Sequence, residues 1–174
     1  MRCFHLETGT ACFKGVPSAS ILKPMLILYR YTADSELLDF CVKIAEDRDR
    51  DDGHMPNIIR NALVGIPIHE QYPHSEEWAK AYETVSCLDG LAELYRVTGV
   101  KKYAESVRCA AELIARYESN IMGSVGFHDI FAHASAVQNA TSEPCDVIHW
   151  IRVCTELFAL TKDLRYAAKM LSQT

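Results

Sequence analysis

The sequence predicts an all-α fold made of helical hairpins, and three observations support this. Apolar residues recur at helical spacing over most of the chain, no segment alternates Val, Ile and Thr between turn signals as a strand does, and one short phrase occurs three times. With 174 residues, 49 % of them hydrophobic, the chain has enough apolar side chain to fill one core. We therefore expect residues 1–174 to form a single all-α domain.

The repeated phrase reads Leu, then Tyr or Phe, then two further residues and Thr, and it occupies residues 28–32, 94–98 and 157–161. The threonines are 66 and 63 residues apart, which is an internal period. Each copy follows one apolar helical stretch and precedes another, and the short linker between them requires an antiparallel pair. Toroids of helical hairpins are built in this way, with their sites in the loops at one end of the ring.

In the middle copy, Leu88, Leu91 and Leu94 mark the apolar face of the first helix, and Gly99 is placed to end it as a left-handed C-cap. Val107 and its apolar neighbours at helical spacing mark the second helix. The whole chain is expected to hold six main helices, over residues 18–31, 35–47, 76–98, 101–118, 143–160 and 163–172.

Two long loops interrupt the repeats. The first, residues 46–75, begins with a charged run in which three aspartates alternate from Asp47 to Asp51, as in a calcium-binding loop. However, Gly53 falls one position late and Ile58 takes the place of the bidentate glutamate, so a solvated charge run is the favoured interpretation.

The second loop, residues 120–142, holds His128, Asp129 and His133 and leads into a predicted helix start. A loop of this length in a compact domain is usually functional or disordered. The helix start is expected to be capped by Ser142.

Cys145 lies at the start of that helix, after a proline that fits the first turn. Free backbone N–H groups and the positive end of the helix dipole favour a thiolate there, although Asp146 works against it. With Glu143 and His149, which shares its helical face, Cys145 could act as a nucleophile or supply zinc ligands. The alternative is that Cys145 is simply a buried structural cysteine, which is more common.

Three stretches, residues 7–12, 80–99 and 143–166, together resemble the catalytic region of glycoside hydrolase family 127, the β-L-arabinofuranosidase-like proteins. The Leu-Tyr-Arg-x-Thr-Gly element in the second stretch is shared by many hairpin toroids. The Glu-x-Cys element after a Gly-rich loop, followed by a helix that ends Leu-x-x-Leu-Thr, is more specific. The resemblance implies an (α/α)6 toroid with attached β-sandwich modules, of which three hairpins would be half a ring.

The resemblance also implies a zinc-bound cysteine nucleophile and a retaining mechanism. By motif, Cys145 matches the nucleophile and a zinc ligand, and Glu143 matches the glutamate zinc ligand. Asp129 is the nearest match to the acid/base glutamate, with His128 as the other candidate. The family completes its zinc site with a cysteine pair far downstream, so the ligand set in this sequence is incomplete.

The expected substrate is a carbohydrate of arabinofuranoside type. We expect His128, His149, Trp150 and His69 to contact it, although core packing for Trp150 and an ordinary surface position for His69 explain these residues equally simply. The competing function is a non-catalytic helical-hairpin interaction or carbohydrate-binding module that has lost the metal site.

Net charge and cysteine content limit the classes of binding partner and the cellular compartment that we expect. A net charge of -5 gives no reason to expect nucleic acid or an anionic membrane, and no apolar run approaches membrane-spanning length. Seven cysteines without a C-x-x-C pair, and no signal peptide, favour the cytoplasm. Three hairpins leave an apolar edge, so we expect either part of a longer chain or a homo-oligomer that covers it.

Overall fold

The computed structural model describes residues 19–49, 57–71, 80–120, 123–127, 130–136 and 142–171. Two residues of the predicted site, His128 and Asp129, lie outside these ranges. Within them the chain forms helices, with only isolated β-bridges between residues 119 and 130 and no strand. The prediction of an all-α fold is confirmed.

All six predicted helices are present in the described part of the chain. The elements are α2 (Leu22–Thr32), α3 (Ser35–Asp47), α4 (Ile58–Val64), η2 (Ile68–Glu70), α5 (Ala81–Thr98), α6 (Lys101–Leu113), η4 (Ile114–Glu118), η5 (Ala134–Ala136), α7 (Pro144–Thr161) and α8 (Leu164–Leu171). Of the short elements, η2 and η5 are 3₁₀ turns, and η4 continues α6 in π-helical form.

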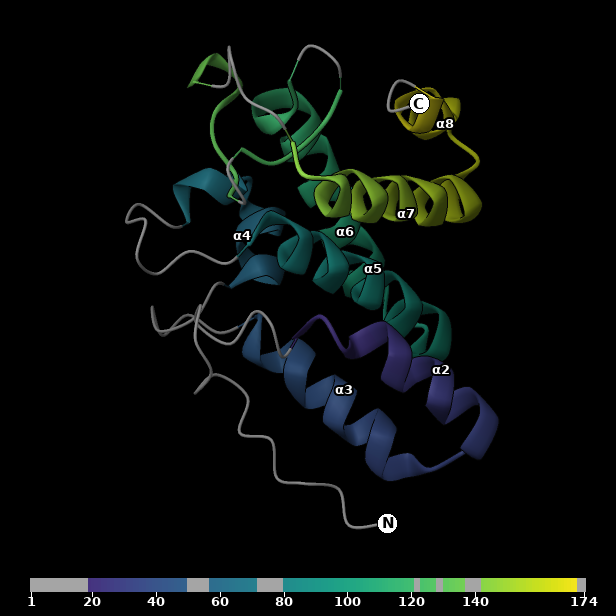
Figure 1. Ribbon diagram of the computed structural model, residues 1–174. Coiled ribbons are helices and arrows are strands. Elements are labelled where there is room, and N and C mark those ends of the chain that lie inside the picture. The colour runs from purple at the N-terminus through teal and green to yellow at the C-terminus, as the bar shows by residue number, and fades with distance from the viewer. Residues whose placement is uncertain are drawn as a thin grey trace.

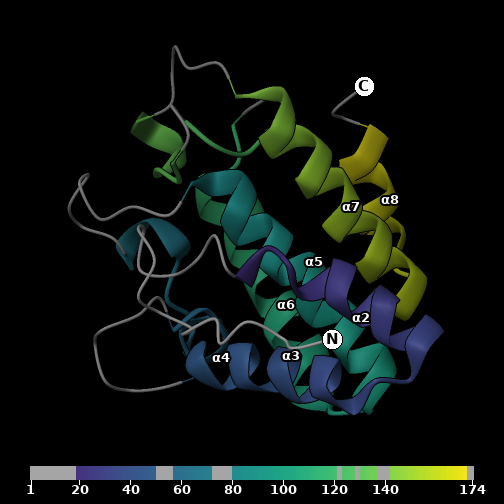
Figure 2. The same ribbon diagram turned by 60° about the horizontal axis from the view of Figure 1, so that its bottom comes forward.

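The first helices of the three hairpins form a row, in which α5 lies between α2 and α7 (Figure 1). The turned view of Figure 2 shows the same order. The second helix of each hairpin, α3, α6 or α8, packs against the first, and α4 packs against α6. Because α5 has neighbours on several sides, it is buried without interruption from Glu83 to Leu94. Burying each large aliphatic side chain of this core contributes about 1.5–3 kcal/mol.

The three hairpin turns share one structure, which explains the repeated phrase. The residue after each threonine is in the left-handed region, with φ of 54° at Ala33, 73° at Gly99 and 60° at Lys162. Each threonine hydroxyl donates to the carbonyl oxygen four residues earlier and accepts the backbone N–H two residues later. The hydroxyl therefore closes one helix and holds the start of the next.

Gly90 lies at a close contact between α5 and α2. A β-carbon at Gly90 would overlap the Cβ of Leu22 and lie 3.2 Å from the backbone nitrogen of Lys23. Glycine inside a helix costs about 0.5–1 kcal/mol relative to alanine. That cost is offset here because the missing side chain lets the first two hairpins pack closely.

The first long loop contains a helix that the sequence pattern did not reveal. α4 is only seven residues long, and it buries Ile58, Ile59 and Ala62 before Gly65 ends it with φ of 84°. So short a segment presents too few apolar positions to establish a helical period. Its packing against α6 provides the stability that its length does not.

The charged run that begins at Glu46 is only partly solvated. Asp47 and Arg48 are both buried, and the carbonyl oxygen of Arg48 accepts a 2.9 Å hydrogen bond from the N–H of Ile59. The expectation of a solvated run is therefore wrong for these two residues, because the start of α4 is held against the end of α3. The next residue, Asp49, forms an ion pair with Lys102 at the start of α6.

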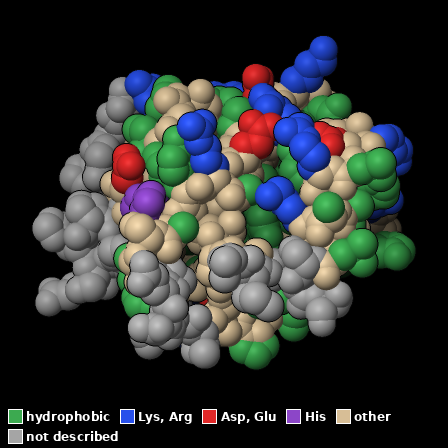
Figure 3. All heavy atoms as spheres, turned by 90° about the horizontal axis from the view of Figure 1, so that it is seen from above, with side chains coloured by type: hydrophobic (Ala, Val, Ile, Leu, Met, Phe, Trp, Pro, Cys, Tyr) green, Lys and Arg blue, Asp and Glu red, His purple; other side chains and the backbone are tan. Residues whose placement is uncertain are grey.

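On the face shown in Figure 3, acidic side chains lie among basic ones, with hydrophobic side chains scattered between them. This face therefore presents no field of a single sign. Among the described residues, no helix combines the length and the apolar character that crossing a membrane requires.

Candidate functional site

The candidate site lies at the end of the helix row opposite the three hairpin turns (Figures 1 and 2). Both α5 and α7 begin at this end, and the segments around η2 and η5 lie beside them. α7 starts with Pro144 in its first turn, as expected. The cap differs from the prediction, because Glu143 is the N-cap residue and the hydroxyl of Ser142 instead donates to the carbonyl of Gly126 at 3.2 Å.

Cys145 is partly exposed in the first turn of α7, and its Sγ lies 3.3 Å from Oε2 of Glu143. Burial, a hydrogen bond to Glu143 and the charges of Asp146 and Glu143 raise the pKa of the Cys145 thiol, against the lowering effect of a backbone hydrogen bond from Asp146. The expectation that the helix start favours a thiolate is therefore wrong for the metal-free chain. Burial comes first among the causes, and the two neighbouring carboxylates add to it.

Tyr82 and His149 complete the surroundings of Cys145. The Tyr82 hydroxyl donates to Oε1 of Glu83 at 3.2 Å, and the Tyr82 ring lies 6.0 Å from the ring of His149. Burial and the positive charge of Arg152 lower the pKa of His149, against the opposing charge of Asp89, and so favour the neutral imidazole. The Nδ1 atom of His149 is buried and has no hydrogen-bond partner. A buried polar atom without a partner is uncommon, which sets His149 apart from an ordinary surface histidine.

The loop before α7 is fixed to the helix at Gly126. Gly126 has φ of 88°, and a β-carbon there would overlap the carboxylate of Asp146. Asp146 is itself fully buried. Only glycine allows the loop backbone to lie this close to α7, so this contact and the Ser142 hydrogen bond together hold the loop over the start of the helix.

A second polar cluster surrounds His69 in η2. Oε1 of Glu118, the last residue of η4, accepts a 2.6 Å hydrogen bond from the His69 backbone N–H and lies 2.9 Å from its ring Nδ1. Burial raises the pKa of Glu118, while its contacts with His69 act in the opposite direction. His69, predicted to bind substrate, is thus oriented by a buried carboxylate.

His133 lies beside this pair. Its ring is 5.5 Å from the His69 ring in an edge-to-face arrangement and 6.4 Å from the Tyr117 ring. Nδ1 of His133 accepts the backbone N–H of Ser135 at 3.2 Å and lies 2.7 Å from its hydroxyl. Two imidazoles and a phenol ring are therefore assembled from three separate segments.

Trp150 lies in the hydrophobic core, with 1 % of its surface exposed. Its ring packs between helices and offers no face to a sugar, so the packing interpretation holds for this residue. Among the other described cysteines, Cys41, Cys87 and Cys154 are buried and Cys109 is half-buried, and all are free thiols. Cys145 stands apart from the three core cysteines by its position at the loop end.

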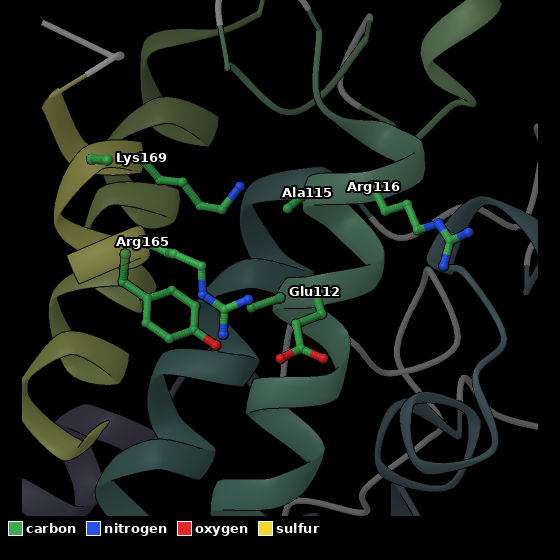
Figure 4. A pocket seen from close by; sticks show the side chains of 8 residues that line it. Glu112, Ala115, Arg116, Arg165 and Lys169 are labelled. Atoms are coloured by element: carbon green, nitrogen blue, oxygen red, sulfur yellow. The ribbon is translucent and has the colours of Figure 1, made fainter. Parts of the chain in front are cut away.

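A groove of about 680 Å³ between α6 and α8 is a separate feature (Figure 4). Arg165 and Lys169 extend from α8 toward α6, whereas Arg116 points away. Arg165 is bound to Asp163, and Arg116 stacks on the ring of Tyr117. Because these cations already have partners, the groove lacks the unengaged charge of an anion site.

The Cys145 and Glu143 pair fits two positions of a metal site. Zinc–sulfur bonds of about 2.3 Å and zinc–oxygen bonds of about 2.0–2.2 Å place two tetrahedral ligands roughly 3.5 Å apart. The observed sulfur–oxygen separation of 3.3 Å is close to this. Within the described ranges, no group of three or more His, Cys, Asp or Glu side chains is arranged to hold a metal ion.

Glu118 was missed by the sequence analysis, although one signal could have indicated it. The predicted helix over residues 101–118 ends on this glutamate, and an acidic residue at a helix C-terminus is opposed by the helix dipole. Residues that violate a local rule often serve a site. The π-helical turn of η4, a form often found at functional sites, adds a structural signal.

Fold and site together define a region of a helical-hairpin toroid with a Glu–Cys pair at its loop end. Three solved structures share this fold with the chain. They are a GH127 beta-arabinofuranosidase (22 % identity, TM-score 0.67, 87 % of this chain), a GH127 beta-L-arabinofuranosidase from Geobacillus stearothermophilus T6 (17 %, 0.66, 88 %) and a glycoside hydrolase (17 %, 0.67, 94 %).

The chain spans only 24 %, 27 % and 30 % of the length of these three proteins. At such identities the likeness establishes the fold, which is the fold that the sequence resemblance implies. No family model and no curated protein matches the chain.

Proposed function

We propose that this chain forms part of the catalytic end of a glycoside hydrolase acting on an arabinofuranoside-type or related glycan. The observation that carries the proposal is the 3.3 Å pairing of Cys145 with Glu143 at the loop end of a fold shared with beta-arabinofuranosidases. Loops at one end of a rigid scaffold are where catalytic residues are commonly placed. His149, with its unpartnered Nδ1, and Tyr82 border the same position.

In the proposed retaining reaction, Sγ of Cys145 attacks the anomeric carbon as the bond to the leaving oxygen breaks, and an acid protonates that oxygen. Asp129 is the proposed acid, and it then removes a proton from the water that displaces the sulfur. The neutral imidazole of His149 and the Tyr82 hydroxyl are placed to bind sugar hydroxyls. Cys145 leaves the second step as a thiolate, ready for another cycle.

Glu143 and Cys145 are the residues that would hold zinc. When bound, zinc would keep the Cys145 sulfur deprotonated at neutral pH. The raised pKa of the thiol supports this part of the proposal, since burial and the Glu143 and Asp146 carboxylates all favour the protonated sulfur. Glu143 therefore has two opposite effects, stabilising the thiol in the metal-free chain and binding the ion in the loaded one.

A non-catalytic module is the second candidate, and one observation favours it. The described residues supply two metal ligands at the site rather than three or four. A module of this kind would bind a carbohydrate through groups such as His149 and Tyr82 without a reactive sulfur. It would bind no zinc at Cys145.

The test combines zinc binding with hydrolysis of a panel of aryl furanosides and pyranosides. We compare the parent chain, Cys145→Ala and the matched control Cys109→Ala, another partly exposed thiol on a different helix. The proposal expects one zinc per chain and glycoside turnover in the parent and in Cys109→Ala, both lost in Cys145→Ala. No turnover by any chain, or equal turnover by Cys145→Ala and its parent, would overturn it.

The role of the sulfur is tested separately with an electrophilic arabinofuranose derivative. Mass spectrometry of the labelled, zinc-loaded chain should find the sugar on Cys145. A label on another cysteine, with zinc still lost in Cys145→Ala, would show that Cys145 binds the metal and another sulfur is the nucleophile.

A further inference from the structure

The Glu118 carboxylate is unusual because it is buried and has one oxygen without a partner. Its side chain has no exposed surface, and Oε2 forms no hydrogen bond. Both hydrogen bonds that reach Oε1 come from His69, one from the backbone and one from the ring. Burying a carboxylate is costly without hydrogen bonds, and the groups that stabilise this one, His69 and the backbone of Ile68, both belong to η2.

The contact with Glu118 determines which nitrogen of the His69 ring carries the proton. An ionised carboxylate only accepts hydrogen bonds, so beside ionised Glu118 the ring nitrogen 2.9 Å from Oε1 carries a proton. That nitrogen is Nδ1, and the backbone N–H of the same residue donates to the same oxygen, which holds the Glu118 carboxylate against η2. Carboxylates fix the tautomer of metal-binding and catalytic histidines in the same manner.

The opposite ring nitrogen, Nε2, is then left with a lone pair. The side chain of His69 as a whole is 16 % exposed, so the ring is partly open to solvent. Within the described part of the chain, Oε1 of Glu70 lies 3.9 Å from Nε2 on a largely exposed side chain, which is beyond hydrogen-bond distance. The His133 ring lies against the His69 ring, with centroids 5.5 Å apart and planes at 69°.

We infer that Glu118 is a positioning residue that keeps the His69 proton on Nδ1, so that Nε2 serves as a hydrogen-bond acceptor for a hydroxyl of a bound polyol or sugar. The π-helical turn of η4 contributes directly, because the Ser119 N–H bonds to the Ile114 carbonyl five residues back at 2.9 Å and Glu118 is carried within that turn. The identity of the ligand as a sugar rests on the proposed function, whereas the tautomer does not.

The tautomer is tested by long-range proton–nitrogen NMR of the ¹⁵N-labelled chain, with the His69 signals assigned through their loss in His69→Gln. The expected spectrum shows a protonated Nδ1 and an unprotonated Nε2. In Glu118→Gln the ring should shift toward the Nε2-protonated form, because an amide can turn its NH₂ toward Nδ1. His133→Gln, which removes the neighbouring ring but no bond to Glu118, should leave the His69 tautomer unchanged.

An Nε2-protonated or doubly protonated His69 in the parent, or a Glu118→Gln chain with dispersed amide signals and an unchanged His69 tautomer, would overturn the inference. If Glu118→Gln fails to fold, the parent and His133→Gln spectra still decide the tautomer.

Titration with methyl arabinofuranoside then separates this inference from the proposed function. We expect the Nε2 signal of His69 to shift in the parent and the shift to fall severalfold in Glu118→Gln. Shifts confined to His149 would overturn the acceptor role of His69 and leave the proposed function standing. No shift at either histidine would count against the proposed function, while the tautomer result would stand on its own.

Discussion

The carboxylate of Asp89 in α5 binds the ammonium of Lys23 in α2 at 2.7 Å. The same carboxylate binds Arg152 of α7 at 2.7 Å, and Lys23 also reaches Glu156 of α7 at 2.8 Å. Asp89 has almost no exposed surface, whereas its cationic partners are partly solvated. One buried acid therefore links the first helices of all three hairpins.

Asp89→Asn should lower the free energy of unfolding by about 2–3 kcal/mol, because Arg152 loses its carboxylate partner and Lys23 keeps only Glu156. Urea denaturation measures the change. Glu112→Gln breaks the exposed Arg108 pair within α6 and is the matched control, expected to cost less than about 0.5 kcal/mol. Equal effects of the two substitutions would show that burial of Asp89 is unimportant.

Gly90→Ala should destabilise the chain despite the better helix propensity of alanine. The added methyl group overlaps Leu22, and relieving such an overlap typically costs about 1–3 kcal/mol, more than the roughly 1 kcal/mol gained in propensity. Thermal unfolding followed by circular dichroism should show a lower Tm. A higher Tm would mean that α2 and α5 can move apart without cost.

Removing glycine from one hairpin turn and introducing it into another should have opposite effects on stability. Gly99→Ala places a side chain at a φ of 73° and should cost about 1 kcal/mol. Lys162→Gly relieves the backbone strain of a non-glycine residue at the equivalent position, where φ is 60°. It should raise the free energy of unfolding or leave it unchanged within about 1 kcal/mol. The comparison of both unfolding curves checks whether the three turns are equivalent.

Cys145 should react slowly with iodoacetamide in chelator-treated protein at pH 7. Its pKa is raised, so the reactive thiolate forms only as the pH approaches that higher value, and the rate should rise steeply with pH. Glu143→Gln removes a hydrogen-bonding carboxylate, lowers the pKa and should accelerate alkylation severalfold at pH 7. Peptide mass spectrometry follows the rate at Cys145 and, as an internal control, at Cys109.

The core cysteines give a second reference for that measurement. Burial raises the pKa of Cys41 and Cys154 to about 12 and that of Cys87 to about 11. These three thiols should stay unlabelled until the chain unfolds. Labelling of any of them at the rate of Cys145 would contradict the described packing.

Much of the fold could be predicted because short local sequence patterns determine it. The repeated Leu-aromatic-x-x-Thr phrase encodes both the end of a helix and the turn that follows, and each copy forms the same hydrogen bonds. α4 could not be predicted, since its stability comes from α6 rather than from a pattern of its own. The burial of Arg48 was missed for the same reason.

The site was predictable only where its residues are neighbours in sequence. Glu143, Cys145 and His149 lie within two turns of one helix, so spacing alone placed them together. His69 and Glu118 are 49 residues apart and meet through the packing of η2 against η4, which no local pattern reports. The direction of the Cys145 pKa shift depended on side-chain distances and was predicted wrongly.

The identical turns and the varied loops occupy opposite ends of the helix row. Changes in the length or composition of the loops that carry His69, His133 and Cys145 therefore leave the contacts of Thr32, Thr98 and Thr161 untouched. Stability and chemistry can consequently evolve almost independently in such a chain, because one end conserves the architecture while the other is free to acquire a new ligand.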